Sequence, residues 1–166
     1  MWGIYKSAGE LVIQADYNVM RYGLDNRRMR IIPSDVKLDC SAWSDGILYI
    51  GTEAGMKLLA GNSIIAAPGA ESLAGERIRT ILPYGDGVIV ATASSGLWFY
   101  SDGRLTEFST GCDEAIRSAE LFTAAVSDSR LAIGTILGGV ILIDLADGSY
   151  EVYDEERGLQ NNTVLS

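Results

Sequence analysis

The sequence predicts an all-β fold: a β-propeller of about four four-stranded antiparallel blades, as part of a larger propeller such as a seven-bladed one. Two observations predict this fold. One phrase recurs along the 166 residues, and pairs of tight-turn residues recur with it. The copies of the phrase are LVIQADYNVMRY from Leu11, LYIGTEAGMKLL from Leu48, VIVATASSGLWFY from Val88 and LAIGTILGGVILI from Leu131.

The period of the phrase is typical of one propeller blade. Taking Ala15, Thr52, Thr92 and Thr135 as equivalent gives spacings of 37, 40 and 43 residues, which is the length that four short strands and their turns require. We therefore expect a single propeller segment over residues 1–166. The predicted repeats cover about 1–34, 35–75, 76–115 and 116–157, and 158–166 begins a further repeat.

Each repeat carries turn residues where a blade needs hairpins, because two antiparallel strands close tightly when Gly, Asn or Asp adopts a positive φ in the turn. Between the expected first and second strands lie Ala8-Gly9, Asp45-Gly46, Gly85-Asp86-Gly87 and Ser127-Asp128-Ser129. Between the third and fourth strands lie Asp25-Asn26, Gly61-Asn62, Asp102-Gly103 and Asp147-Gly148. The small residues Gly51, Ala91 and Gly134 each precede a repeat threonine and leave room for a neighbouring sheet.

Composition and charge exclude several classes of protein. The chain is 48% hydrophobic and 21% charged, which is typical of a soluble globular protein with a real core and not of a disordered one. Its net charge of -9 disfavours nucleic acid as a partner, because the phosphate backbone would repel it. The first twenty residues contain no apolar run of the kind that forms a signal peptide or membrane helix.

The histidine and cysteine content excludes several kinds of catalytic and metal site. The chain has no histidine, which removes imidazole bases, histidine metal ligands and Ser-His-Asp triads. Its two cysteines, Cys40 and Cys112, are far apart and predict buried thiols, neither a zinc knuckle nor a redox pair. The acidic run 154–156 lacks EF-hand spacing and is interpreted as a solvated connector. We expect no cofactor and no metal.

The closing segment RGLQNNTVLS, together with WSDGILYIGTEAGMKLL and SSGLWFY, resembles the two-component regulator propeller repeat. The match to its GL-x-x-N-x-V phrase falls on Gly158, Leu159, Asn162 and Val164. Two departures stand out. The tryptophan of the family phrase is replaced by Tyr49, Ile89 and Ala132, and Gln14-Ala15 stands in place of Gly-Thr.

The resemblance implies a bacterial sensor propeller, in a periplasmic or other extracytoplasmic location, that relays a signal to an output domain elsewhere in a membrane sensor. The expected first strand at 1–5 aligns with 78–82, and Thr163–Ser166 begins another first strand. We interpret the chain as consecutive repeats of a longer polypeptide, which predicts open blade edges. Two copies would then associate as a homodimer through those edges, or four blades would close into a small ring.

Ligand-binding residues are expected on the loops between second and third strands, which share one face of the propeller with the connectors between blades. On these loops Tyr17, Asn18, Glu53, Ser94 and Ser95 combine an aromatic face with amide, carboxylate and hydroxyl groups. Such a set suits a small polar ligand, for example a carbohydrate, and a protein partner is the alternative. Solvated loop tips with no ligand are also compatible with these residues.

Three functions remain open from the sequence. The leading hypothesis is a non-catalytic sensor or ligand-binding module, with no catalytic residues. The second is a propeller enzyme, a lyase or glycoside hydrolase, in which Asp or Glu residues such as Asp16 and Glu53 act as acid and base at the channel mouth. The third is a protein-interaction scaffold.

Overall fold

The computed structural model describes residues 3–127 and 129–164, and within them the chain is almost entirely strand and turn. The strands are β1 (Gly3–Ser7), β2 (Glu10–Gln14), β3 (Asn18–Gly23), β4 (Met29–Pro33), β5 (Cys40–Ser44), β6 (Ile47–Thr52), β7 (Gly55–Ala60), β8 (Ser63–Ala66), β9 (Ile78–Tyr84), β10 (Gly87–Thr92), β11 (Leu97–Ser101), β12 (Arg104–Glu107), β13 (Leu121–Val126), β14 (Arg130–Thr135), β15 (Val140–Asp144) and β16 (Tyr150–Tyr153). One short α-helix, α1 (Asp113–Ser118), and two 3₁₀ turns, Glu71–Leu73 and Glu155–Arg157, lie in the connectors.

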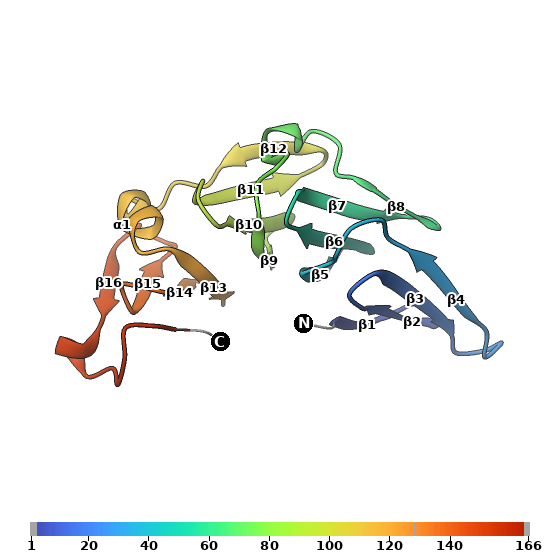
Figure 1. Ribbon diagram of the computed structural model, residues 1–166, viewed down its shortest axis with the longest axis horizontal. Coiled ribbons are helices and arrows are strands. Elements are labelled where there is room, and N and C mark those ends of the chain that lie inside the picture. Colours follow the sequence, from blue (N-terminus) through green and yellow to red (C-terminus); the bar gives the residue numbers. More distant parts are fainter. Residues whose placement is uncertain (1–2, 128, 165–166) are drawn as a thin grey trace.

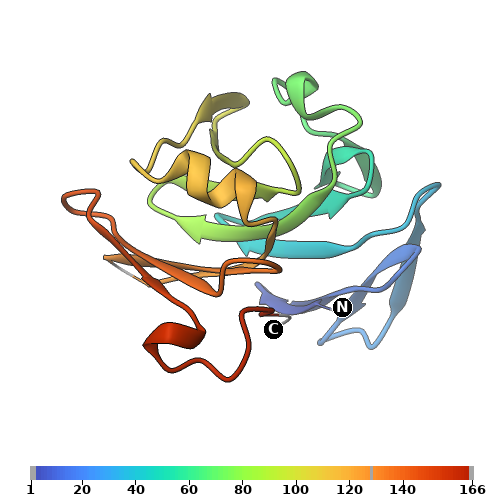
Figure 2. The ribbon, with the colours of Figure 1, turned by 60° about the vertical axis from the view of Figure 1, so that its left-hand side comes forward.

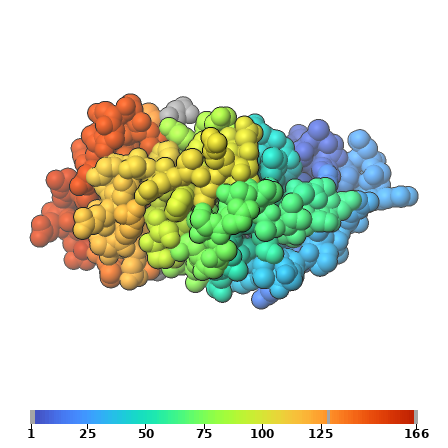
Figure 3. Space-filling model, turned by 90° about the horizontal axis from the view of Figure 1, so that it is seen from above, coloured from blue at the N-terminus to red at the C-terminus, as the bar shows by residue number. Residues whose placement is uncertain are grey.

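The strands form four separate four-stranded antiparallel sheets, each made of consecutive strands. The predicted all-β propeller fold of four blades is confirmed, and we number the blades 1 to 4 in chain order. They lie along an arc, with β1, β5, β9 and β13 on its inner side and β4, β8, β12 and β16 on its outer side (Figures 1 and 2). Seen from above, the blades stand side by side in chain order (Figure 3).

Three apolar cores fill the spaces between neighbouring blades. Val12 and Val19 of blade 1 pack on Leu48 and Ile50 of blade 2. Equivalent cores join blade 2 to blade 3 and blade 3 to blade 4. Because middle strands are covered on both faces, they read as continuous apolar runs, as in β10 where every residue is buried.

The repeat threonines close the hairpins between second and third strands. The hydroxyl of Thr92 donates to the carbonyl of Gly96 at 2.9 Å and accepts from the amide of Ser95 at 2.9 Å. Thr52 and Thr135 make the corresponding pairs of bonds. Each threonine is therefore a buried polar side chain that satisfies two backbone groups, which explains its recurrence.

The small residue before each threonine permits close approach of the next blade, as the sequence indicates. A Cβ added to Gly51 would lie 2.8 Å from Cγ2 of Ile78, and one added to Gly134 would lie 2.7 Å from Cγ1 of Val164. Blade 1 has Gln14 at this position, and its side-chain amide reaches the connector to blade 2 instead.

The last described residues, 163–164, lie where the sequence predicts the start of a further repeat. Thr163 and Val164 are not in a strand, and residues 165–166 lie outside the described residues, as do residues 1–2 of the expected first strand. The amide of Val164 nevertheless donates to the carbonyl of Thr135 at 2.8 Å. A further repeat after residue 157 stays a prediction.

Both cysteines are free thiols away from each other in the sequence, and Cys112 is buried. Burial raises the pKa of the Cys40 thiol to about 12, and the carboxylate of Asp39 adds to the shift. Neither thiol is therefore poised to form a thiolate at neutral pH. Among the described residues, no helix has the length and apolar character that a membrane crossing requires.

Candidate functional site

The candidate site is a cluster of polar side chains where the connectors meet the loops between second and third strands. The connectors are tied to these loops by backbone bonds: the amide of Leu38 donates to Asp16, that of Ala93 to Arg77, and that of Ile136 to Glu120. We call the charged cluster on this face the mouth. It consists of Lys37, Asp39, Glu53, Glu76 and Arg77, with Ser94 and Ser95.

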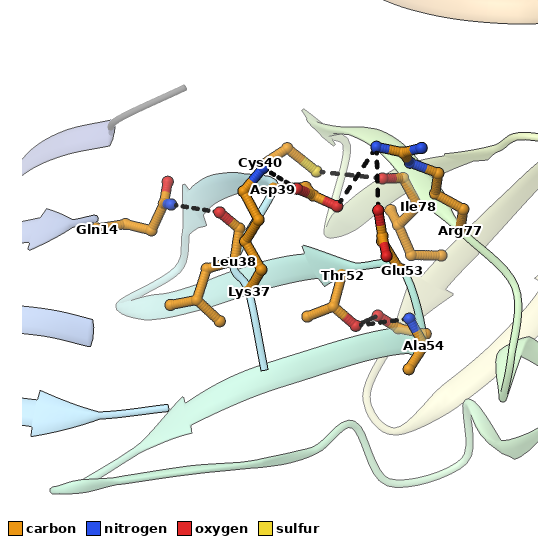
Figure 4. A network of polar contacts seen from close by, with 11 residues as sticks. Gln14, Lys37, Leu38, Asp39, Cys40, Thr52, Glu53, Ala54, Arg77 and Ile78 are labelled. Atoms are coloured by element: carbon orange, nitrogen blue, oxygen red, sulfur yellow. Dashed lines mark hydrogen bonds and ion pairs between the residues drawn. The ribbon is translucent and has the colours of Figure 1, made fainter. Parts of the chain in front are cut away.

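Ion pairs join blades 2 and 3 at the mouth (Figure 4). Arg77 Nη2 lies 3.4 Å from Glu53 Oε1 and 3.9 Å from Asp39 Oδ2. Lys37 Nζ lies 3.4 Å from Asp39 Oδ1. Asp39 is mostly buried, and its Oδ2 has no hydrogen-bond partner among the described residues. Because this atom is buried and faces the guanidinium of Arg77, Asp39 is a fixed part of the network, and Arg77 and Glu53 are its more exposed members.

Glu76 is held by the two serines of the neighbouring loop. Its Oε1 accepts from the amide and hydroxyl of Ser94, at 2.9 and 2.8 Å, and its Oε2 accepts from the hydroxyl of Ser95 at 2.9 Å. Burial alone would raise the pKa of Glu76, but these hydrogen bonds outweigh it and lower the pKa. The carboxylate is thus charged at neutral pH and fixes the loop geometry.

Two further side chains project from bulges in the inner strands. The pairing of β9 with β10 shifts register at Arg79, and that of β13 with β14 shifts at Phe122. The guanidinium of Arg79 lies 5.4 Å from the centroid of the Phe122 ring, within the range of a cation–π contact. The Nε atom of Arg79 is buried and lacks a hydrogen-bond partner among the described residues.

The mouth contains charges of both signs. Lys37 and Arg77 oppose Asp39, Glu53 and Glu76, within a chain whose net charge is -9. A neutral or zwitterionic polar molecule would meet both donors and acceptors there without net repulsion. In the part of the chain that the structure describes, no group of three or more carboxylate or thiol side chains is arranged to hold a metal ion.

A depression lies on the outer rim between blades 1 and 2. This outer groove has a volume of about 480 Å³ and is lined by Glu10, Arg21, Gly23, Asn26, Arg28, Met29, Arg30, Gly61 and Asn62. Arg21 Nε donates to both oxygens of Glu10 at 3.0 Å, and Nη1 donates to the carbonyl of Gly61 at 2.9 Å. The guanidinium of Arg21 is therefore already hydrogen-bonded to partners within the fold.

Comparison with solved structures agrees with a propeller. The extracellular domains described for the hybrid two component systems BT4673 and BT3049 of B. thetaiotaomicron match 96% and 90% of this chain, with TM-scores of 0.69 and 0.67 and sequence identities of 17% and 18%. The WD40 β-propeller domain of Doa1 matches 90% of the chain and the chain covers 53% of it, with a TM-score of 0.62 and 13% identity. At such identities the likeness shows the fold.

The chain spans about a quarter of the length of the two B. thetaiotaomicron chains, 23% and 24% respectively. An enzyme is also among the similar structures: dihydro-heme d1 dehydrogenase NirN matches 90% of this chain and is covered to 35%, with a TM-score of 0.66 and 18% identity. No protein-family model and no curated protein sequence matches the chain.

The structure brings three of the five predicted ligand residues into the mouth. Glu53 pairs with Arg77, and Ser94 and Ser95 bind Glu76, the residue before Arg77. Tyr17 is exposed on the loop of blade 1, and Asn18 begins β3 with a buried Oδ1 that has no hydrogen-bond partner among the described residues. Among the described residues, no side-chain hydrogen bond or ion pair joins either residue to the mouth, so their role stays a prediction.

Sequence reasoning missed Lys37, Asp39, Arg79 and Phe122. A signal for three of them was present, because Asp39, Arg79 and Phe122 each follow a buried residue at or just before the start of the inner strand, namely Leu38, Ile78 and Leu121. Their spacings of 40 and 43 residues equal those of the repeat threonines. One position in the repeat therefore supplies a carboxylate, a guanidinium and an aromatic ring to the inner rim.

Proposed function

We propose that the chain is a non-catalytic sensor module of the two-component regulator propeller type, which binds a small polar ligand at the mouth. The observation that carries the proposal is the ion-pair network of Asp39, Arg77 and Glu53, in which Arg77 and Glu53 remain 45% and 65% exposed on their side chains. The groups come from blades 2 and 3 and the connectors that lead into them, with an apolar core between the two blades, so the constellation is held by rigid elements.

The chemistry of the mouth favours a neutral ligand with many hydroxyl groups, such as a carbohydrate. Glu53 supplies acceptors, and the guanidinium of Arg77, which is 45% exposed on its side chain, supplies donors in a planar fork. On the inner rim, the Phe122 ring carries Arg79 on one face. Aromatic rings and planar donors are the groups that orient polar ligands in largely preformed sites.

Acid–base catalysis is less well supported by the same residues. A glycoside hydrolase or lyase requires a carboxyl group with a raised pKa to act as acid. Four described carboxyl groups, Asp35, Glu76, Asp113 and Asp147, have shifted pKa values, and all four shifts are downward. Glu76 in particular is engaged by two serines.

The location and family remain part of the proposal. An extracytoplasmic location is supported by the similar extracellular domains of two-component proteins and by the GL-x-x-N-x-V phrase near the end of the chain. In this role the propeller would hold its ligand outside the membrane and pass a change in interdomain contact to an output domain.

A thermal-shift screen with neutral mono- and oligosaccharides tests the proposal, with inorganic phosphate and calcium chloride as ionic comparisons. Any hit is then titrated calorimetrically. Arg77→Ala should weaken binding about tenfold or more, because one hydrogen bond from a charged group contributes about 1.5–3 kcal/mol. Asp39→Asn should also weaken binding, since it removes the negative charge that faces the guanidinium of Arg77.

The matched control is Arg104→Ala. Arg104 is exposed at the start of the outer strand β12, so its loss removes a comparable cation away from the mouth. Its binding constant should equal that of the unmodified chain. A screen with no saccharide hit, or a hit whose affinity is unchanged by Arg77→Ala and Asp39→Asn, would contradict the proposal.

A further inference from the structure

An apolar sheet face of blade 1 is exposed, and it lies on the side away from blade 2. Its two cross-strand rows are Ile4, Ile13, Met20 and Ile31, and Lys6, Leu11, Tyr22 and Met29. We call these eight residues the blade 1 open face. Seven of the eight are apolar or aromatic, and Ile31 is 62% exposed. Contiguous exposed apolar patches of this kind mark interaction surfaces.

The repeat shows what such a face is built to contact. Leu11 and Ile13 occupy the positions of Leu48 and Ile50 in blade 2, which are 0% exposed because blade 1 packs on them. Leu131 and Ile133 of blade 4 are buried in the same way by blade 3. In blade 1 the equivalent residues are only half-buried. The blade 1 open face thus has the composition of an inter-blade contact.

The complementary face is found at the other end of the arc. On the side of blade 4 away from blade 3, one row consists of Ala125, Ala132, Leu142 and Glu151, and we call this row the blade 4 open face. The next row is partly covered, because Gly134 is buried against the chain's own Val164. Ala132 occupies the position of Ile89, which is buried against blade 4. Small and apolar side chains therefore predominate on this face too.

We propose that two copies of the chain associate face to face, with the blade 4 open face of each copy packed on the blade 1 open face of the other. The contact repeats the geometry of the three inter-blade contacts within the chain. Blades 1 and 4 lie at the two ends of the arc (Figure 1), so a copy related by a two-fold axis meets both faces at once. This symmetry closes the assembly at two copies. The inference goes beyond the proposed ligand function and does not depend on it.

Charge at the outer rim favours this pairing. Within the chain, outer strands meet outer strands, as β4 meets β8. In the proposed contact β16, with Glu151 at the end of its row, meets the start of β4, which follows the exposed pair Arg27 and Arg28. Each open face has one charged residue, Lys6 on the inner strand of blade 1 and Glu151 on the outer strand of blade 4, so the contact places no like charges of the two faces opposite each other. Packing apolar faces without like charges supports stable association.

Light scattering of the 166-residue chain after size exclusion tests the proposal. The expected mass is twice the chain mass of 17.8 kDa. Ile31→Lys on blade 1 and Ala132→Arg on blade 4 should each give the single-chain mass, because each places a charge in both contacts. Leu137→Lys is the matched control, since Leu137 lies on a loop and is 61% exposed; it should leave the double mass unchanged.

Far-UV circular dichroism and thermal unfolding of each variant show whether it is folded, and both altered positions are partly or largely exposed in the single chain. A single-chain mass for the unmodified protein at its highest soluble concentration would overturn the proposal. So would a double mass that survives in folded Ile31→Lys and Ala132→Arg. A ladder of higher masses would overturn the closed two-fold arrangement.

Discussion

The first and second inter-blade contacts place the same elements side by side but fill the space between them differently. Between blades 2 and 3, Gly51 leaves room for Ile78 and the contact is apolar. Between blades 1 and 2, Gln14 fills the equivalent space and is bonded to the carbonyl of Leu38 and the hydroxyl of Ser41, each at 3.0 Å. The difference shows that one position in the repeat can act by its size or by its hydrogen bonds.

The polar contact has a consequence for the mouth. Ser41 Oγ also lies 2.9 Å from the hydroxyl of Tyr5, so the chain Tyr5, Ser41, Gln14 and Leu38 runs from blade 1 to the residue before Asp39. Burial raises the pKa of Tyr5, which keeps its hydroxyl protonated over the physiological range. Side-chain bonds therefore fix Asp39 from one side, and the backbone and serines of blade 3 fix Glu76 and Arg77 from the other.

The largest expected effect comes from disrupting the apolar contact between blades 2 and 3. In Gly51→Val the new Cβ would lie 2.8 Å from Ile78 Cγ2, and two added methyl groups have no space. Overpacking of this kind costs about 1–3 kcal/mol, and we expect the upper end in urea denaturation. Ser63→Val, at an exposed strand position, is the control and should change stability by less than about 0.5 kcal/mol. Equal effects for the two variants would contradict the close packing.

The second prediction concerns the hairpin that supports the mouth serines. Thr92→Val keeps the shape of the side chain but leaves the Gly96 carbonyl and the Ser95 amide without the hydroxyl. The expected loss of unfolding free energy is about 2 kcal/mol, the cost of unsatisfied buried polar groups. The exposed Thr106→Val serves as control. A loss no greater than that of the control would show that the hydroxyl has no structural role.

A smaller effect should follow from removing the polar bridge in the first contact. Gln14→Leu has similar volume but cannot bond Leu38 or Ser41, so we expect about 1–2 kcal/mol of destabilisation. Because Gln14 bonds to the carbonyl of Leu38, the residue before Asp39, the amide resonance of Asp39 should also shift in the variant. A variant as stable as the original chain, with an unchanged Asp39 resonance, would remove the distinction between the two contacts.

The smallest expected effect is on the pH dependence of the folding stability. Because the folded state lowers the pKa of Glu76, its carboxylate stabilises the fold above the unfolded pKa of about 4.3. This stabilisation is lost as the pH falls through the lower folded pKa. Glu76→Gln should therefore flatten the stability curve below about pH 4.3 and leave its shape near neutrality unchanged. An identical acid limb in both proteins would contradict the role of the two serines.

Much of the architecture could be predicted from the sequence because turns and small residues follow local rules. Gly46, Gly61, Gly103 and Gly148 all adopt positive φ in the predicted hairpins, and Gly51 is packed as its size indicates. The mouth and the inner rim were predictable only in part. The mouth loops recur visibly, but Asp39 and Arg79 stand in runs that read as ordinary strand residues, and the register shift that turns Arg79 inward is set by pairing with β10.

The partners of the predicted residues were equally hidden. Ser94 and Ser95 look free in the sequence, yet both are bound to Glu76, which lies 18 and 19 positions away. Such a contact depends on how the connector crosses the loop, and local propensity does not determine it. The repeat suggests a homodimer through open blade edges. The exposed apolar surface belongs instead to sheet faces, and the proposed association uses those faces.

Amide chemical-shift mapping with a saccharide from the screen distinguishes ligand binding at the mouth from binding in the outer groove. We expect perturbations at Asp39, Glu53, Arg77 and Ser94, which share the mouth, with little change at Gly23 and Asn62 of the outer groove. Perturbations confined to the outer groove, with the mouth unchanged, would show that the mouth is not the ligand site.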